Sequence, residues 1–263
     1  MMLTRDELEE YRTFRDPYLT EKDYLQELIL REAYSDWGQA ASLIFKGGTA
    51  LSKFYYSGRF SEDLDFTFVG TADELKSVVK SMEGMPRRLF YETSFVSEPA
   101  ANKFGTINAE LGIKGPRYAG RESTLQHIKL EINTMSQALR RPSQLPRTPL
   151  YADVAGYMGT VMAKEEILSE KFRAIMSKTR RHRERDLYDM CFLLAKGIVP
   201  DMEEVSKKLD EAGTLFSKEV LLEAIEGVSS SWKDLEPFVG GRLESYDSAR
   251  ERTVGFLQRF GIF

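Results

Sequence analysis

The stretch from Phe45 to Phe68, FKGGTALSKFYYSGRFSEDLDFTF, decides the fold that we expect for this chain. It is typical of a strand end, a glycine turn, a short helix over 49–56, a loop, and a second strand over 63–69. Asp63 and Asp65 are two residues apart on that second strand, so their side chains point to the same side. The intervening and following apolar residues point to the other side. The stretch therefore predicts a strand that carries two carboxylates on one face and core side chains on the other.

Two carboxylates at short range repel each other, and a divalent cation is the usual compensation. Mg²⁺ prefers one or two carboxylates together with the phosphate oxygens of a substrate. We therefore predict that Asp63 and Asp65 bind Mg²⁺, with Mn²⁺ as an alternative ion.

The glycine turn supplies a second part of the same site. Gly47 and Gly48 precede a helix that we expect to begin at Thr49. Glycine lets the backbone approach a ligand closely, and a helix N-terminus offers N–H groups and a positive dipole end to a phosphate. Each motif alone is more often a plain turn or a solvated strand edge. Their combination predicts a nucleoside triphosphate (NTP) that is bound through Mg²⁺.

The spacing of these motifs resembles that of a known superfamily. DNA polymerase β-type nucleotidyltransferases carry Gly-Ser, a spacer of about a dozen residues, and Asp-x-Asp; here Gly48-Thr49 is followed by thirteen residues and Asp63-Leu64-Asp65. More narrowly, KGGTAL at 46–51 and RFSEDLDF at 59–66 look like the AbiEii/AbiGii nucleotidyltransferase toxin family. Thr49 replaces the serine and keeps a hydroxyl. The candidate nucleotide-binding residues are Lys46, Gly47, Gly48, Thr49, Lys53, Arg59 and Ser61.

A third carboxylate is implied by the resemblance. In this superfamily it comes from a strand next to the Asp-x-Asp strand. The segment 125–133, LQHIKLEIN, alternates cleanly and places Lys129, Glu131 and Asn133 on one face. Glu131 is our candidate for the third metal ligand. The alternative, a solvated strand face, remains open.

A second pair of blocks extends the resemblance. EKFRA at 170–174 and RDLYD at 185–189 match two further patterns of the AbiEii-like family. The resemblance implies that Lys171 stabilises charge on the leaving pyrophosphate and that Asp186 or Asp189 is essential. The sequence does not separate the two aspartates. The alternative is that these charges form surface ion pairs, in which case Lys171→Met would leave the kinetics unchanged. We expect Lys171→Met to lower the turnover while the fold stays intact.

The remaining chain predicts an α/β (or α+β) fold with a mixed sheet, flanking helices and a C-terminal helical domain. The proline-rich, basic segment 140–150 marks the predicted boundary, which gives a nucleotidyltransferase domain over 1–145 and a mainly helical domain over 146–263 that closes the active-site cleft. Further strands are expected over 43–45, 90–97, 103–113 and 125–133. Further helices are expected over 3–16, 20–36, 71–82, 161–177, 185–198, 201–212, 216–227 and 243–260.

Composition narrows the functional class. The chain has 263 residues, a net charge of −4 and one cysteine, Cys191, which lies in an apolar helical run and is expected to be a buried thiol. No apolar run reaches about eighteen residues, and the first residues do not resemble a signal peptide, so we expect a cytoplasmic protein without a membrane partner. The basic run 178–185 is either a solvated face or a guide for RNA phosphates.

These observations predict transfer of a nucleoside monophosphate (NMP) from an NTP to an acceptor hydroxyl. The resemblance implies the toxin of a toxin–antitoxin or abortive-infection pair, with tRNA or another RNA as one acceptor and a DNA-binding antitoxin as partner. One alternative is a nucleotidyltransferase that modifies a protein or a small molecule. A second is a nucleotide-binding module without catalysis, which the intact Asp63-Leu64-Asp65 motif disfavours.

Overall fold

The computed structural model describes residues 2–36, 42–103, 105–179 and 181–263, and the chain divides into two compact units. Unit 1 is Met1–Met162 and unit 2 is Ala163–Phe263. The predicted boundary at residue 145 is therefore wrong and moves to 162. The segment that we expected to be a linker instead forms a strand of the unit 1 sheet.

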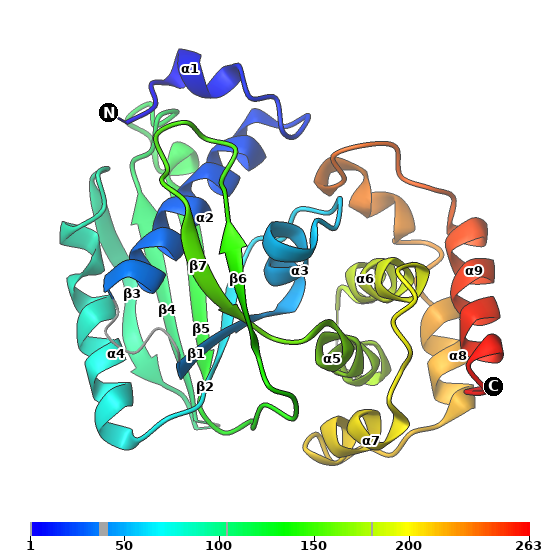
Figure 1. Ribbon diagram of the computed structural model, residues 1–263. Helices are drawn as coiled ribbons and strands as arrows, with labels where there is room; N and C mark the ends of the chain where they lie inside the picture. The colour runs from blue at the N-terminus through cyan, green and yellow to red at the C-terminus, as the bar shows by residue number, and fades with distance from the viewer. Residues whose placement is uncertain (1, 37–41, 104, 180) are drawn as a thin grey trace. The chain divides into compact units, whose positions relative to one another are not determined.

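Unit 1 contains a mixed sheet that is seven-stranded in the described residues, with the order β3-β4-β5-β2-β1-β7-β6 (Figure 1). This architecture confirms the predicted α/β class. Its elements are α1 (Arg5–Glu9), α2 (Pro17–Asp36), β1 (Leu43–Lys46), α3 (Gly47–Tyr55), β2 (Leu64–Phe68), α4 (Ala72–Gly84), η2 (Met85–Arg87), β3 (Thr93–Ala101), β4 (Thr106–Ile113), η3 (Glu122–Thr124), β5 (Gln126–Asn133), β6 (Ser143–Arg147) and β7 (Tyr157–Val161).

The strand register places one polar row across the middle of the sheet. Antiparallel pairing sets Lys46 of β1 opposite Asp65 of β2, and parallel pairing sets Asp65 beside Glu131 of β5. Glu131 in turn lies opposite Asn108 of β4. The neighbouring row points to the other face and is apolar and buried: Phe45, Phe66, Ile132 and Ile107. One face of the sheet is thus core and the other carries the polar residues.

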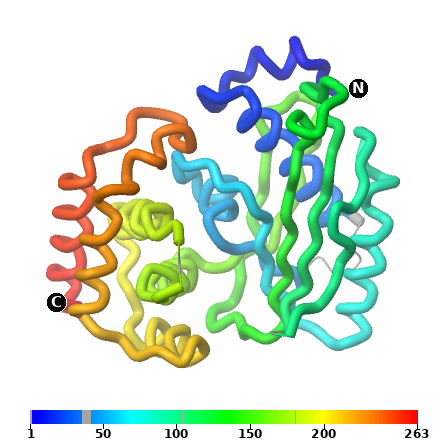
Figure 2. The backbone as a smooth tube through the Cα atoms, turned by 180° about the vertical axis from the view of Figure 1, so that it is seen from behind, coloured from blue at the N-terminus to red at the C-terminus, as the bar shows by residue number. Residues whose placement is uncertain are grey.

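Helix α2 covers the core face. Its apolar side chains Tyr24, Leu25, Leu28 and Ile29 are all buried, and the helix contacts β5 and β7. The view from behind brings β4 and β5 to the front, with α2 behind them (Figure 2). On the opposite face of β5, Lys129 and Glu131 are exposed. The polar row therefore lies on the face that α2 leaves open.

Three predicted boundaries in unit 1 differ from the structure, and the backbone properties of the residues explain each difference. The helix expected over 3–16 ends at Glu9, and Arg12 beyond it has a φ of 42°, which a continuing helix does not allow. The connection expected at Pro99 lies inside β3, which is an edge strand where a proline without an N–H is tolerated. The same reasoning explains how Pro146 fits into β6, the other edge strand, in the segment that we predicted to be a linker.

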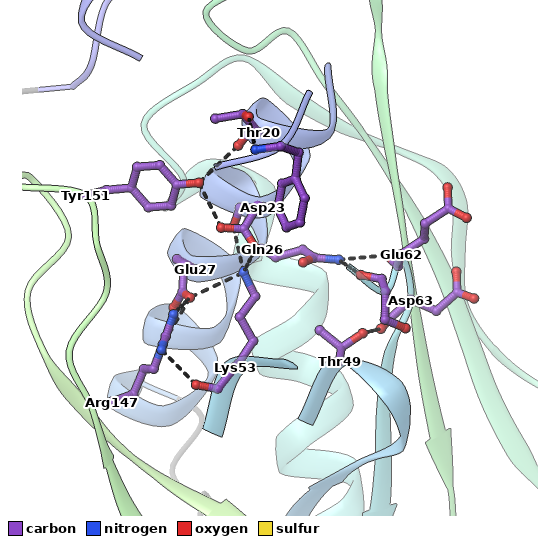
Figure 3. Close-up of polar contacts among 12 residues, drawn as sticks. Thr20, Asp23, Gln26, Glu27, Thr49, Lys53, Glu62, Asp63, Arg147 and Tyr151 are labelled. Carbon is purple, nitrogen blue, oxygen red and sulfur yellow. Dashed lines mark hydrogen bonds and ion pairs between the residues drawn. The ribbon is translucent and has the colours of Figure 1, made fainter. Parts of the chain in front are cut away.

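A buried ionic network fixes α3 to α2 and to β6 (Figure 3). The Lys53 Nζ lies 2.5 Å from Asp23 Oδ1 and 3.2 Å from Glu27 Oε1. The Arg147 Nη2 lies 2.6 Å from Glu27 Oε1, and its Nη1 donates to the Lys53 carbonyl at 2.7 Å. Tyr151 donates to Asp23 Oδ2 at 2.7 Å. The two cations balance the two carboxylates, which makes their burial tolerable.

Unit 2 is helical, as predicted. Its elements are α5 (Lys164–Met176), α6 (Arg183–Ala195), α7 (Met202–Asp210), α8 (Lys218–Glu226), η4 (Trp232–Phe238) and α9 (Tyr246–Arg259). Cys191 on α6 is 2% exposed, which confirms the buried thiol, and burial raises the pKa of that thiol. In the part of the chain that is described, none of the helices has the length and apolar character needed to cross a bilayer.

Replacing Glu27 with glutamine should destabilise unit 1, because Arg147 then loses its buried carboxylate partner. Burial by itself raises the pKa of Glu27, but Lys53 and Arg147 lower it overall. A lowered pKa stabilises the fold above the unfolded-state pKa of about 4.3, and this contribution is lost as the pH falls through the folded-state pKa. We expect Glu27→Gln to lower the free energy of unfolding by about 3–5 kcal/mol at pH 7 and by less at pH 4.

Urea denaturation at both pH values measures this difference. Asp73→Asn is the matched control, because the Asp73 side chain is 90% exposed and its removal should change the free energy of unfolding by no more than about 0.5 kcal/mol. A loss for Glu27→Gln that is equal at pH 7 and pH 4 would contradict the lowered pKa.

Candidate active site

The glycine turn packs directly against site side chains. Gly47 has a φ of +74°, and a Cβ built on it would lie 2.6 Å from Asp65 Oδ2. A Cβ on Gly48 would overlap the Arg59 guanidinium and lie 2.8 Å from Ser61 Oγ. Both positions therefore require glycine, because no larger residue leaves room for these polar groups. Gly47 is the first residue of α3, so the N-terminus of that helix packs against the Asp65 side chain.

The loop over 59–63 is held in place by two side chains from neighbouring helices (Figure 3). Gln26 on α2 donates from Nε2 to the carbonyls of Ser61 and Glu62, at 2.9 Å each. Thr49 on α3 donates from Oγ1 to the Asp63 carbonyl at 2.5 Å. These bonds fix the backbone that leads into β2. The sequence analysis missed Gln26, although a polar residue inside the apolar stripe of α2 is the signal that could have revealed it.

Six of the seven predicted nucleotide-binding residues lie together around the glycine turn. They are Lys46, Gly47, Gly48, Thr49, Arg59 and Ser61. Thr49 and Arg59 are 0% and 2% exposed, and Arg59 donates from Nη1 to the Phe60 carbonyl at 2.9 Å, so both shape the loop. Lys53 is the exception. Its ammonium is buried in the network with Asp23 and Glu27, so the structure gives Lys53 a structural role in place of the predicted nucleotide contact.

The three predicted metal ligands line one pocket. Asp63, Asp65 and Glu131 border a cavity of about 420 Å³ on the open face of the sheet. Asp63 lies one residue before β2, which begins at Leu64, so the strand predicted from residue 63 starts one residue too early. No group of three His, Cys, Asp or Glu side chains is already arranged around a metal position within the described residues. A set of carboxylate oxygens suits Mg²⁺, which completes its shell with water and substrate oxygens.

The same pocket contains residues that the sequence analysis did not single out. Ser97 of β3, Asn108 and Glu110 of β4, and Lys129 of β5 also line it. Lys129 shares its strand face with Glu131, so the alternation of β5 was the available signal. The β3 and β4 residues had no such signal, because only the register brings their strands beside β5.

In unit 2, Lys171 is held between two buried aspartates. Its Nζ lies 3.0 Å from Asp186 Oδ1 and 2.7 Å from Asp189 Oδ2. Both aspartates are 0% exposed and Lys171 is 7% exposed. The surface-pair alternative is therefore wrong for Lys171. Both aspartates bind the lysine, and which of the two is essential stays a prediction. We therefore now expect Lys171→Met to destabilise the fold, because the substitution would leave two buried carboxylates without this cation.

A second buried lysine in unit 2 was missed. The Lys208 Nζ lies 2.8 Å from Glu166 Oε1 and 3.5 Å from Glu170 Oε1, and Lys208 is 1% exposed. Burial by itself lowers the pKa of Lys208, but Glu170 and Glu166 raise it overall. This ion cluster joins α7 to α5. The sequence carries no periodic signal for such a pair.

The basic run 178–185 is partly used inside unit 2. Arg183 donates from Nη2 to the Ser177 carbonyl at 2.7 Å, and the Arg185 guanidinium lies 4.9 Å from the Phe238 ring centroid. Arg180 lies outside the described residues. The two interpretations of this run, a solvated face or a guide for RNA, stay open.

Comparisons with known proteins identify the family and the fold. The family model described as nucleotidyl transferase AbiEii toxin, type IV TA system, matches residues 28–251. The solved structure of MenT4, a nucleotidyltransferase toxin from Mycobacterium tuberculosis H37Rv, has a TM-score of 0.69 at 19% identity, covering 97% of this chain and 90% of its own. JHP933 from Helicobacter pylori has a TM-score of 0.58 at 15% identity, covering 94% and 93%. At these identities the two structures show the fold alone. No curated protein sequence matches significantly.

Replacing Gly47 with alanine should destabilise unit 1 more than the same change at Gly120. Both glycines have a positive φ, so each substitution costs about 1–2 kcal/mol of backbone strain. A Cβ at Gly120 meets nothing within 4 Å, whereas a Cβ at Gly47 displaces the Asp65 carboxylate. We expect an additional loss of about 1–3 kcal/mol for Gly47→Ala in urea denaturation. Equal losses for the two variants would show that the turn does not press on Asp65.

Proposed function

Because the chain belongs to the AbiEii family of nucleotidyltransferase toxins from type IV toxin–antitoxin systems, we propose that its unit 1 pocket transfers NMP from an NTP to an acceptor hydroxyl. The family match confirms the resemblance carried by 46–51 and 59–66, and it makes the chain a nucleotidyltransferase. One observation supports placing the chemistry here: the register sets Asp65 beside Glu131 while the glycine turn packs on the Asp65 carboxylate.

We propose that Asp63 and Asp65, with Glu131 as a third ligand, hold Mg²⁺ at this pocket, or Mn²⁺ in its place. The donor chemistry supports this proposal, since all three offer carboxylate oxygens to one cavity. When bound, the ion offsets phosphate charge and lowers the pKa of an acceptor hydroxyl.

The other residues of unit 1 bind and orient the nucleotide in this proposal. The N–H groups at the start of α3 and the turn at Gly47 and Gly48 hold the phosphates, and Lys46 supplies countercharge. Thr49 and Gln26 keep the loop before β2 fixed, so that Asp63 and Asp65 keep their positions without rearranging. The acceptor hydroxyl attacks the α-phosphorus and pyrophosphate leaves on the opposite side.

We propose an RNA acceptor, with the 3′ end of tRNA as the first candidate, and a separate DNA-binding antitoxin as partner. The type IV toxin family supports an antitoxin partner, and unit 1 offers an exposed pocket to a large substrate. A protein or small-molecule acceptor is the alternative. Labelled NTP distinguishes these cases, because the label would move to RNA in the first and to protein or a small product in the second.

Asp65→Asn should reduce transfer by at least about 100-fold, because the amide keeps the shape of the side chain but removes the charge that binds the cation. The measurement is label transfer from each of the four α-³²P NTPs to total tRNA with Mg²⁺. Asp73→Asn, an exposed change on α4, should leave the rate unchanged. EDTA should abolish transfer, and Mn²⁺ should restore part of it. Full activity of Asp65→Asn would refute the metal assignment.

Lys171→Met should reduce the transfer rate more than Lys208→Met does. The two lysines are matched, since each is buried between two carboxylates of unit 2 and each substitution removes a buried cation. We expect both variants to lose about 3–5 kcal/mol of stability. Transfer is therefore measured at a temperature where urea denaturation shows both variants folded. Equal losses of activity for the two variants would give Lys171 a structural role. If Lys171→Met does not fold, Lys171→Arg keeps the charge and provides a folded variant for the same measurement.

A further inference from the structure

The pocket that contains the proposed metal ligands continues away from the glycine turn. The sheet order runs from β1 through β2, β5 and β4 to β3. The turn follows β1, the carboxylates lie on or beside β2 and β5, and the pocket then extends over Lys129, Asn108 and Ser97 on β5, β4 and β3. In the order of the strands, Asp63 and Asp65 therefore lie between the turn and these three residues, while Glu131 shares β5 with Lys129.

This order has a consequence for an in-line transfer. The attacking oxygen and the leaving pyrophosphate occupy opposite sides of the α-phosphorus. If the turn holds the phosphates that leave, the acceptor must approach from the side of β5, β4 and β3. The residues on that side are therefore placed to contact the acceptor.

Among Lys129, Asn108 and Ser97, Lys129 carries the positive charge. It is exposed on the pocket face, and its ammonium has no ion-pair partner within the described residues. Glu110, which lies opposite Lys129 in the register, directs its carboxylate to His127 Nδ1 at 2.8 Å. The ammonium is thus available to an anion that enters the pocket.

The charge of the pocket limits which acceptors suit it. Its acidic lining residues are Asp63, Asp65, Glu110 and Glu131, and Lys129 is its cation in the described chain. An acceptor with a phosphodiester group is repelled by these carboxylates unless a cation meets its phosphate. A neutral acceptor has no such need. The presence of Lys129 among the carboxylates therefore favours an acceptor that carries a phosphate.

We propose that Lys129 determines acceptor specificity by binding the phosphate next to the reacting hydroxyl of a nucleic-acid end. Asn108 and Ser97 offer an amide and a hydroxyl to the sugar or base of the same terminal nucleotide. This inference rests on the proposed function, and it adds the side of the pocket from which the acceptor enters and the group that recognises it. Lys129 is a binding residue in this account and takes no part in the chemical step.

The test is the steady-state kinetics of Lys129→Met with α-³²P NTP and total tRNA. We expect the KM for tRNA to rise by about tenfold while the Kd for NTP, measured by equilibrium dialysis, stays unchanged. The slope of log affinity for tRNA against log salt concentration should fall by about one, as expected for the loss of one phosphate contact. Lys129→Arg should keep most of the affinity. Lys76→Met, a change of an exposed lysine on α4, is the matched control and should behave like the unchanged chain.

The outcomes separate this inference from the proposed function. If the unchanged chain labels no RNA with any NTP, the proposed RNA acceptor fails. If the unchanged chain labels tRNA and Lys129→Met has the same KM for tRNA, the role of Lys129 is refuted. A weaker Kd for NTP with an unchanged KM for tRNA would place the phosphate of the nucleotide at Lys129 and overturn the proposed direction of entry.

Discussion

The candidate site depends on the pairing of β1 with β2. That pairing sets Lys46 opposite Asp65 and brings the glycine turn, which follows β1, back against the Asp65 carboxylate. A shift of one residue would turn Asp65 to the core face and an apolar neighbour to the pocket. The buried row of Phe45 and Phe66 prevents that shift, since it would expose both rings. The hydrophobic core therefore fixes the geometry of the polar face.

The helix behind the turn is fixed by charge as well as by packing. Lys53 and Arg147 lie among buried carboxylates that come from α2. Such a network contributes little net stability, because desolvation offsets much of the Coulomb attraction. It does make a displaced α3 costly, since a move would leave buried charges unpaired. The network therefore favours one position of the helix whose first residue, Gly47, packs on the Asp65 carboxylate.

Unit 2 repeats this use of buried lysines. Lys171 joins α5 to α6 through two aspartates, and Lys208 joins α7 to α5 through two glutamates. Only the first cluster was visible in the sequence, because it matched a family pattern. The second has no motif and lies on a helix with an ordinary amphipathic pattern. Buried ion pairs between distant segments leave no local signature, so their discovery required the packed structure.

Local sequence determined the turn at Gly47 and the carboxylate pair at Asp63 and Asp65, because glycine conformation and strand alternation act over a few residues. It also determined the α/β class and the family, since both follow from short motifs at fixed spacing. Tertiary structure alone decided that 143–147 is an edge strand of the sheet, that Lys53 is a core cation, and that Ser97 and Asn108 lie in the pocket of the carboxylates. These features depend on which strands and helices become neighbours, and that choice is made by the burial of the whole core.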